Sequence, residues 1–244
     1  MRSPRDDPTL AGEYAPRISG ASKIRDWDGP VIGVLGGTFD PIHFGHLRPA
    51  LEVHESLGLQ KLLFIPSHVP PHRGAPAAAA GHRLAMVERA IAGVPGFRVD
   101  SRELDRSGPS YTVDTLRALR GEIGAERPLL LIMGLDAFAG LGTWHRWREI
   151  PTLAHVVVAH RPGSTMPEDA AYLDLAPATE SRSALADKAS GLVSFQSVTQ
   201  LDISATDIRE RLGAGRSPRY LLPDSVWHYI TEHHLYRTNP EDPQ

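Results

Sequence analysis

The sequence predicts an α/β fold: a doubly wound parallel sheet with helices on both faces. Short apolar runs alternate along the chain with segments whose apolar residues recur every three or four positions. This alternation is typical of buried parallel strands and amphipathic helices. The chain has 244 residues, of which 41% are hydrophobic, and is long enough for one such domain with a sizeable core.

Three strands and three helices are expected in the first half of the domain. The strands are short apolar runs, and the helices are marked by spacings such as that of Leu84, Val87 and Ile91. In chain order, the elements are strand 31–35, a helix from Gly45 onward, strand 61–66, helix 82–91, strand 97–100 and helix 111–119. Residues 67–81 contain three prolines and are predicted to form a long loop.

The second half continues the pattern after residue 127. The expected elements are strand 127–133, a helical segment over 136–150, strand 155–159, a loop or weakly ordered insertion over 161–191, strand 192–196, a helix after Ser204 and a closing helix containing Val226, Tyr229 and Ile230. We therefore place one domain at residues 31–237. Residues 1–30 are expected to be a poorly ordered extension and residues 238–244 a frayed tail.

Composition excludes several classes of function. The 26 basic and 29 acidic side chains give a net charge of −3, so no basic field favours nucleic acid. The chain has no cysteine, which excludes disulfides and thiolate metal sites and fits a reducing cytosol. Apolar runs are too short to cross a membrane, and the first residues lack the apolar core of a secretory signal. We expect a cytoplasmic protein that binds neither nucleic acid nor membrane.

Residues 36–46 combine features that bind phosphate. The first strand ends at Gly36 and Gly37, where the chain is expected to turn in unusual dihedrals and bring backbone N–H groups near a bulky anion. His43 and His46 lie three positions apart at the start of the next helix, so both can face that anion beside the positive end of the helix dipole. The pattern predicts a phosphate site with built-in cations.

A second helix start carries donors of the same kind. Ser204 is the predicted N-cap, and Ile208 and Leu212 form the apolar stripe of the helix. Thr206 and Arg209 lie within its first two turns, so hydroxyl, guanidinium and backbone N–H groups could converge on the outer phosphates of a triphosphate. We expect the two helix starts to hold the same polyphosphate.

Asp40, His43 and His46 could also be read as zinc ligands. The glycine-containing turn suits an anion better than a metal, so we favour the phosphate interpretation. Asp40 is then expected to brace the loop as a turn residue and not to contact the ligand.

Both motifs resemble those of a known superfamily. Residues 37–46, Gly-Thr-Phe-Asp-Pro-Ile-His-Phe-Gly-His, match the G-T-F-D-P-x-H-x-G-H signature of nucleotidyltransferases, which join a nucleoside triphosphate to a phosphorylated acceptor. Residues 203–209, Ile-Ser-Ala-Thr-Asp-Ile-Arg, are similar to the I-S-[SA]-T-x-I-R motif of the same superfamily. The glycine spacings of a redox dinucleotide loop or a P-loop do not occur. The resemblance implies a Rossmann-like nucleotidyltransferase fold.

The middle of the chain resembles bacterial nicotinate mononucleotide adenylyltransferases. The segments concerned are Pro-Pro-His-Arg at 70–73, Pro-Ser-Tyr-Thr at 109–112, Gly-Leu-Asp-Ala-Phe at 134–138 with Thr-Trp at 143–144, and His-Arg-Pro-Gly at 160–163. This resemblance extends over about residues 31–237. The chain departs from the family pattern at Leu135, often polar or aromatic there, and at Arg73, where lysine is also used.

The resemblance implies direct adenylyl transfer from ATP to nicotinate mononucleotide, with Mg²⁺ delivered by ATP and no metal site on the protein. The residues expected at ATP are Gly36, Gly37, Thr38, Phe39, His43, His46, Arg73, Ser204, Thr206 and Arg209, of which His43, His46 and Arg209 are the expected catalytic residues. The residues expected at the acceptor are Tyr111, Thr112, Asp136, Trp144, His145 and Arg161. An indole face can stack on a pyridine ring, and a carboxylate can accept from sugar hydroxyls.

Simpler interpretations of several residues remain open. Tyr111 and Thr112 could be only a helix start, Trp144 and Trp147 could anchor a helix in the core, and Arg161 could be solvated. Alternative functions are transfer to nicotinamide mononucleotide or phosphopantetheine, cytidylyl or flavin adenylyl transfer, and a catalytically silent nucleotide sensor. A homo-oligomer is also left open.

Overall fold

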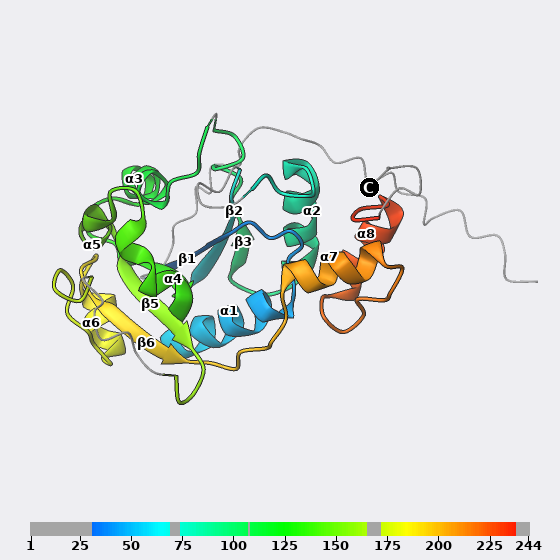
Figure 1. Ribbon diagram of the computed structural model, residues 1–244. Helices are drawn as coiled ribbons and strands as arrows, with labels where there is room; N and C mark the ends of the chain where they lie inside the picture. Colours follow the sequence, from blue (N-terminus) through cyan, green and yellow to red (C-terminus); the bar gives the residue numbers. More distant parts are fainter. Residues whose placement is uncertain (1–30, 69–73, 107, 165–171, 238–244) are drawn as a thin grey trace, which may run out of the picture.

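A six-stranded parallel sheet forms the centre of the molecule in the computed structural model, which describes residues 31–68, 74–106, 108–164 and 172–237 (Figure 1). Its order is β3-β2-β1-β4-β5-β6, and every neighbouring pair is parallel. The strands are β1 (Ile32–Gly37), β2 (Lys61–Pro66), β3 (Phe97–Val99), β4 (Leu129–Gly134), β5 (His155–His160) and β6 (Val193–Ser197). The predicted doubly wound α/β fold and its six strands are confirmed.

Helices bury both faces of the sheet, as the unbroken apolar strands require. In β2, Leu62 and Phe64 face one core cluster, while Leu63 and Ile65 face the other. The first cluster includes residues of α1 (Phe44–Leu57), α2 (Ala80–Ile91), α6 (Arg182–Asp187), α7 (Ala205–Gly213) and α8 (Asp224–Glu232). The second includes residues of α3 (Thr112–Ile123), α4 (Leu135–Ala139) and α5 (Ile150–Leu153).

Two predicted segments differ from the structure. The expected helix over 136–150 is broken into α4, two short 3₁₀ turns and α5, because α4 ends at Gly140 and Arg146 takes a positive φ of 53°. The expected loop over 161–191 contains α6, whose N-cap Ser181 accepts a hydrogen bond from the Ala184 N–H at 3.2 Å. Local capping chemistry was sufficient to begin a helix there.

The expected glycine turn is also wrong. Gly36 and Gly37 continue β1, and the left-handed conformation is taken by Phe39, whose φ is 49°. Gly37 serves a different purpose, since a Cβ there would lie 2.9 Å from atoms of the Phe39 ring. The glycine therefore makes room for an aromatic side chain that folds back under the strand end.

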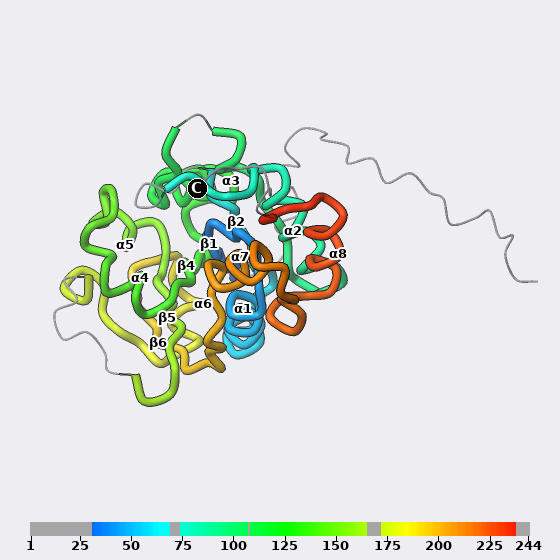
Figure 2. Tube along the Cα trace, turned by 45° about the vertical axis from the view of Figure 1, so that its right-hand side comes forward, coloured from blue at the N-terminus to red at the C-terminus, as the bar shows by residue number. Residues whose placement is uncertain are grey.

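The strand order reverses between β1 and β4, and the helices that follow these two strands, α1 and α4, pack on opposite faces of the sheet. Ligands of doubly wound sheets bind at such a point, outside the carboxyl ends of the strands. The start of α7 lies beside the start of α1 at this edge, as both views show (Figure 1, Figure 2). None of the helices in the described ranges has the length and apolar composition needed to cross a bilayer.

Candidate active site

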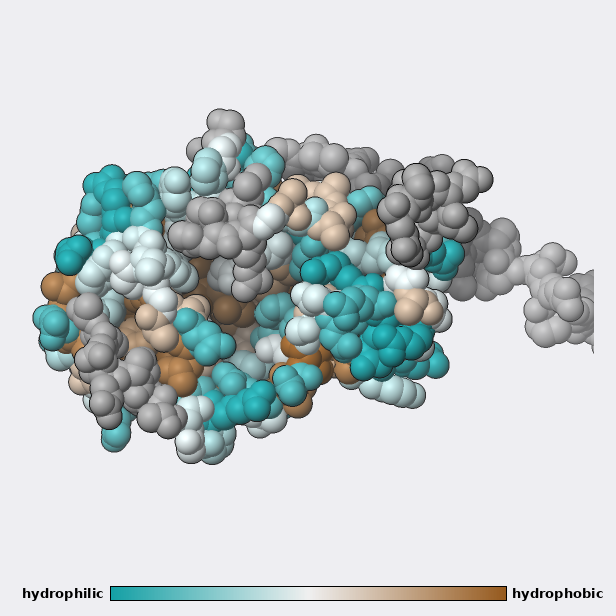
Figure 3. Space-filling view, in the orientation of Figure 1, coloured by the Kyte–Doolittle hydropathy of each residue, from teal (hydrophilic) through white to brown (hydrophobic). Residues whose placement is uncertain are grey.

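The candidate active site lies at the carboxyl edge of the sheet, where β1 and β4 separate. A Cβ added at Gly36 or at Gly134 would meet no atom within 4 Å, so both strand ends border open space. Figure 3 shows that this face of the molecule is hollowed, with hydrophobic residues at the bottom of the hollow and hydrophilic residues over α7 at its side. Gly134 was not among the predicted site residues, although a glycine directly after a buried apolar run was an available signal.

The first helix start carries the two histidines in direct contact. His43 is the N-cap residue of α1, and its ring centroid lies 3.8 Å from that of His46. The backbone N–H of His43 donates to His46 Nδ1 at 3.4 Å, and the Phe39 ring packs edge-on against His46. Phe39 is only 2% exposed, so its backbone, and not its ring, is available to a ligand. The spacing of three positions therefore places the two imidazole rings side by side, as predicted.

Burial makes His43 neutral in the absence of ligand. The side chain is buried, and desolvation lowers the pKa of His43 from 6.5 to about 4. Its Nδ1 atom has no hydrogen-bond partner in the described part of the protein. The expectation of two built-in cations is therefore wrong for His43, which offers a neutral imidazole whose protonation an anion would favour.

The second helix start has the predicted geometry. The Ser204 hydroxyl oxygen accepts from the Asp207 N–H at 3.0 Å, which confirms Ser204 as the N-cap of α7. One turn later, Arg209 Nη2 donates to the Thr206 hydroxyl oxygen at 3.3 Å. A hydroxyl, a guanidinium and a helix N-terminus therefore lie together, which is a favourable arrangement for a phosphate group.

The two helix starts meet in space. Arg209 Nη1 donates to the backbone carbonyl oxygen of Asp40 at 2.7 Å, which joins α7 to the loop before α1. A Cβ added at Gly45 would lie 3.1 Å from the Ile203 carbonyl oxygen. The predicted juxtaposition of the motifs at 36–46 and 203–209 is confirmed, whereas contact with ATP stays a prediction.

Asp40 braces the loop, as expected. Its carboxylate accepts from the backbone N–H groups of Ala77 and Ala78 at 2.7 and 3.1 Å, and from the Tyr236 hydroxyl at 2.7 Å. The carboxylate therefore holds the loop, and as an anionic acceptor it is not a group that would bind a phosphate. Across the described ranges, no group of three or more carboxylate or imidazole side chains is arranged to hold a metal ion.

Arg83 was missed by sequence analysis, although it supports the same loop. The side chain is 1% exposed, and its guanidinium donates to the carbonyl oxygens of Thr38 at 2.7 Å, His68 at 3.2 Å and Ala78 at 3.3 Å. Burial lowers the pKa of Arg83, although the nearby Asp40 opposes the shift. Arg83 stands four positions before the apolar Val87, and so on the apolar face of the predicted helix, which was the available signal. Arg73 lies outside the described residues.

Two of the predicted acceptor residues, Tyr111 and His145, are in contact with each other. Tyr111 is the N-cap residue of α3, next to Thr112, and its ring centroid lies 4.3 Å from that of His145. Trp144 and Trp147 are half-buried and pack on the second core cluster, which is compatible with the simpler interpretation. The Tyr111 and His145 rings therefore contact each other at this edge, while stacking of Trp144 on a nicotinate ring stays a prediction.

Two charged acceptor candidates follow the neighbouring strands. Asp136 is exposed in the first turn of α4, directly after β4. Arg161 is exposed directly after β5, and its Nη2 lies 3.9 Å from Asp202 Oδ1. The parallel sheet places both residues at the edge that carries the phosphate motifs, and the simple solvated role of Arg161 remains compatible with this geometry.

The chain is similar in sequence to known proteins over most of its length. The cytidylyltransferase-like family model matches residues 34–211. A probable nicotinate-nucleotide adenylyltransferase of Marinobacter nauticus is 49% identical over 213 residues, covering 86% of this chain and 99% of the relative. One of Pseudomonas putida is 50% identical, covering 84% of this chain and 94% of the relative.

A solved structure shares the fold at low sequence identity. It is the Plasmodium falciparum nicotinic acid mononucleotide adenylyltransferase complexed with NaAD, with a TM-score of 0.65 and 16% identity over 87% of this chain and 100% of that chain. The identities near 50% over nearly the whole length of the curated relatives carry the assignment. The chain therefore belongs to the cytidylyltransferase-like family and, within it, to the nicotinate-nucleotide adenylyltransferases.

Proposed function

We propose that the protein transfers the adenylyl group of ATP to nicotinate mononucleotide, forming nicotinate adenine dinucleotide and pyrophosphate in NAD biosynthesis. The observation that carries the proposal is the meeting of two helix N-termini, linked by Arg209 and Asp40, beside the open ends of β1 and β4. The curated relatives bear the name of this activity, and a related structure contains the dinucleotide NaAD.

The chemistry needs no covalent enzyme intermediate. An oxygen of the acceptor's 5′-phosphate attacks the α-phosphorus of ATP, and the bond from that phosphorus to the bridging β-phosphate oxygen breaks as pyrophosphate leaves. The protein's part is to align the phosphates and to stabilise the charge that develops on them. Imidazoles of His43 and His46 would act near the α- and β-phosphates, and Arg209 near the leaving pyrophosphate.

Magnesium would reach the site with ATP. Mg²⁺ favours oxygen ligands, keeps several of its waters and is commonly bound through substrate phosphates together with one or two carboxylates. The donors that line the described phosphate motifs are imidazole, hydroxyl and guanidinium groups, which suit phosphate oxygens better than a hard cation. This chemistry supports a metal held mainly by the nucleotide, where it would neutralise phosphate charge.

The acceptor would lie beside the Tyr111–His145 pair. The two rings provide an aromatic surface for a pyridine ring, and the N-terminus of α3, directly after Tyr111, favours a carboxylate. Asp136 is exposed in the first turn of α4, after β4, and could accept from ribose hydroxyls. These features support the acid nucleotide over its amide. The net charge of −3 and the absence of cysteine support action in the cytoplasm without nucleic acid.

A panel of acceptors tests the proposal. Pyrophosphate release is measured with ATP and Mg²⁺ in the presence of nicotinate mononucleotide, nicotinamide mononucleotide or 4′-phosphopantetheine. We expect the highest kcat/KM with nicotinate mononucleotide. A preference for another acceptor would replace the proposed substrate, and ATP binding without pyrophosphate release from any acceptor would identify a nucleotide sensor.

A further inference from the structure

Tyr236 connects the last described turn of the chain to the phosphate loop. It follows α8, and its hydroxyl lies 2.7 Å from Asp40 Oδ1, across 196 positions of sequence. The backbone of Tyr236 is held in the left-handed region, with a φ of 62°, a conformation unfavourable for an aromatic residue. Such a conformation persists only where the surroundings enforce it.

The Tyr236 hydroxyl is a hydrogen-bond donor at every working pH. Burial raises the pKa of Tyr236 well above its usual value, and the hydrogen bond to Asp40 and the charge of that carboxylate raise it further. Two backbone N–H groups complete the set of donors to the Asp40 carboxylate. The side chain of Asp40 is therefore held by three donors. Two of them are backbone N–H groups, and the third is the Tyr236 hydroxyl.

Asp40 in turn contacts Arg209 through its backbone. The backbone carbonyl oxygen of Asp40 accepts from Arg209 Nη1 at 2.7 Å, while Nη2 of the same guanidinium contacts the Thr206 hydroxyl. A guanidinium held by two acceptors has a fixed plane, and this plane sets the direction of its remaining N–H groups. The position of the Asp40 backbone therefore determines how Arg209 faces a polyphosphate.

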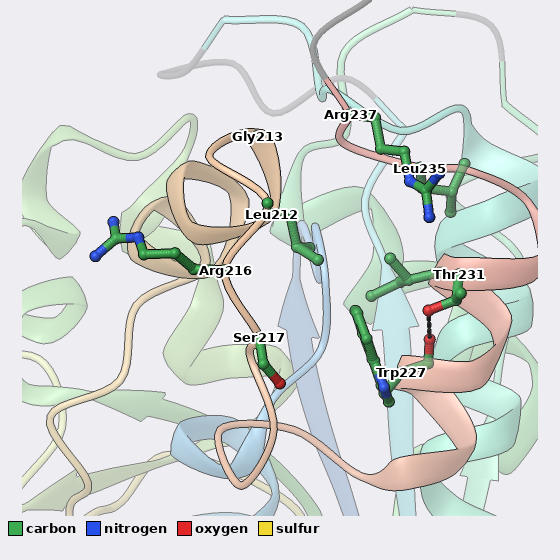
Figure 4. A pocket seen from close by; sticks show the side chains of 10 residues that line it. Leu212, Gly213, Arg216, Ser217, Trp227, Thr231, Leu235 and Arg237 are labelled. Carbon is green, nitrogen blue, oxygen red and sulfur yellow. Dashed lines mark hydrogen bonds between the residues drawn. The ribbon is translucent and has the colours of Figure 1, made fainter.

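The segment around Tyr236, which donates the hydrogen bond to Asp40, has open space beside it. Leu235 and Arg237, on either side of Tyr236, line a cavity of about 420 Å³ between α7 and α8 (Figure 4). Trp227 and Leu212 line the same cavity from the two helices. Leu235 and Tyr236 also pack against the first core cluster, and the hydrogen bond to Asp40 adds a directed contact to a segment that borders open space on its other side.

We propose that Tyr236 is a positioning residue for adenylyl transfer: its hydroxyl fixes Asp40, and Asp40 in turn fixes the guanidinium of Arg209 that faces the leaving pyrophosphate. Tyr236 touches neither reacting group and acts through these two residues. The inference rests on the proposed function, because it assigns a role within the same site.

The test removes one oxygen atom. In Tyr236→Phe the ring remains, while the donor to Asp40 is lost. The matched control is Tyr229→Phe in α8, which removes a buried hydroxyl that contacts His82 Nδ1 at 2.9 Å and has no contact with Asp40. We expect Tyr236→Phe to lower kcat about tenfold, as the loss of one hydrogen bond to a charged group would do, with little change in the KM for nicotinate mononucleotide. Tyr229→Phe is expected to retain wild-type kcat.

A double-mutant cycle separates positioning from general support of the fold. If Tyr236 acts through Arg209, Tyr236→Phe has no further effect on kcat in an Arg209→Ala background. Equal losses in both backgrounds would overturn the proposal, as would wild-type kcat in Tyr236→Phe. An unfolded Tyr236→Phe beside a folded Tyr229→Phe would also overturn it, because the hydroxyl would then be needed for folding. Wild-type protein inactive with every acceptor would instead refute the proposed function.

Discussion

The imidazole rings of His43 and His46 lie with their centroids 3.8 Å apart and their planes inclined by 31°. Two imidazolium ions at this separation would repel each other, and burial adds a further penalty for charging His43. The ligand-free site therefore keeps His43 neutral. A polyphosphate brought to these rings reverses the balance, because its negative charge favours the protonated form.

The first prediction concerns the titration of His43. In the free protein, the pKa of about 4 means that the His43 ring should not titrate between pH 5 and pH 8. Saturation with ATP should raise this pKa into that range. Histidine ring signals followed by NMR with and without ATP check both statements, with His43→Gln to assign the resonance. A His43 signal that titrates near pH 6.5 without ligand would contradict the prediction.

The same shift predicts how stability depends on pH. The folded-state pKa of His43 lies below its unfolded value of 6.5, so the unfolded chain binds more protons between pH 6.5 and pH 4. Stability contributed by neutral His43 is present above pH 6.5 and is lost as the pH falls toward 4, by about 3 kcal/mol. Urea unfolding at several pH values should show a shallower acid loss in His43→Gln than in wild type.

His46 is predicted to be a direct phosphate donor. His46→Ala should lower kcat by about 10²–10³, the usual effect of removing one donor to developing negative charge. Steady-state rates of pyrophosphate release measure the loss, and an unchanged circular dichroism spectrum shows that the variant is folded. A folded variant with wild-type turnover would remove His46 from the catalytic residues.

Gly45 is predicted to set the distance between the two helix starts. A Cβ at Gly45 would lie 2.9 Å from His43 Nδ1 and 3.1 Å from the Ile203 carbonyl oxygen, so Gly45→Ala must displace the His43 ring and press on the backbone before α7. We expect kcat to fall about tenfold or more, since small displacements of aligned groups reduce rates strongly. The control is Gly81→Ala in α2, where a Cβ meets nothing within 4 Å.

Gly81→Ala should keep full activity and raise the free energy of unfolding by about 0.5–1 kcal/mol, because alanine favours the helix. Equal kinetics in the two alanine variants would show that the spacing of α1 and α7 does not matter for the reaction.

Arg83 is predicted to stabilise the loop that carries the first motif. Arg83→Met leaves the carbonyl oxygens of Thr38, His68 and Ala78 without their donor, at an expected loss of about 3 kcal/mol in unfolding free energy. Arg48→Met removes an exposed ion pair with Glu52 and should lose less than about 1 kcal/mol. Urea denaturation compares the two, and a similar small loss in both would refute the structural role of Arg83.

Features that depend on neighbours in sequence could be predicted. Ser204 was recognised as an N-cap because capping requires only a hydroxyl and the N–H groups of the next residues. The strands were recognised because both faces of a parallel sheet are buried. The turn expected at Gly36 and Gly37 failed for the opposite reason: packing of the Phe39 ring, and not glycine freedom, decided where the chain turns.

The sequence by itself determined the α/β class, the six strands and two phosphate motifs, because periodicity, capping and motif spacing are properties of adjacent residues. The tertiary structure alone decided that β1 lies beside β4, that His43 is neutral, and that Tyr236 reaches Asp40 across 196 positions. Desolvation and long-range hydrogen bonds exist only once distant segments have packed together, and one-dimensional patterns do not contain them.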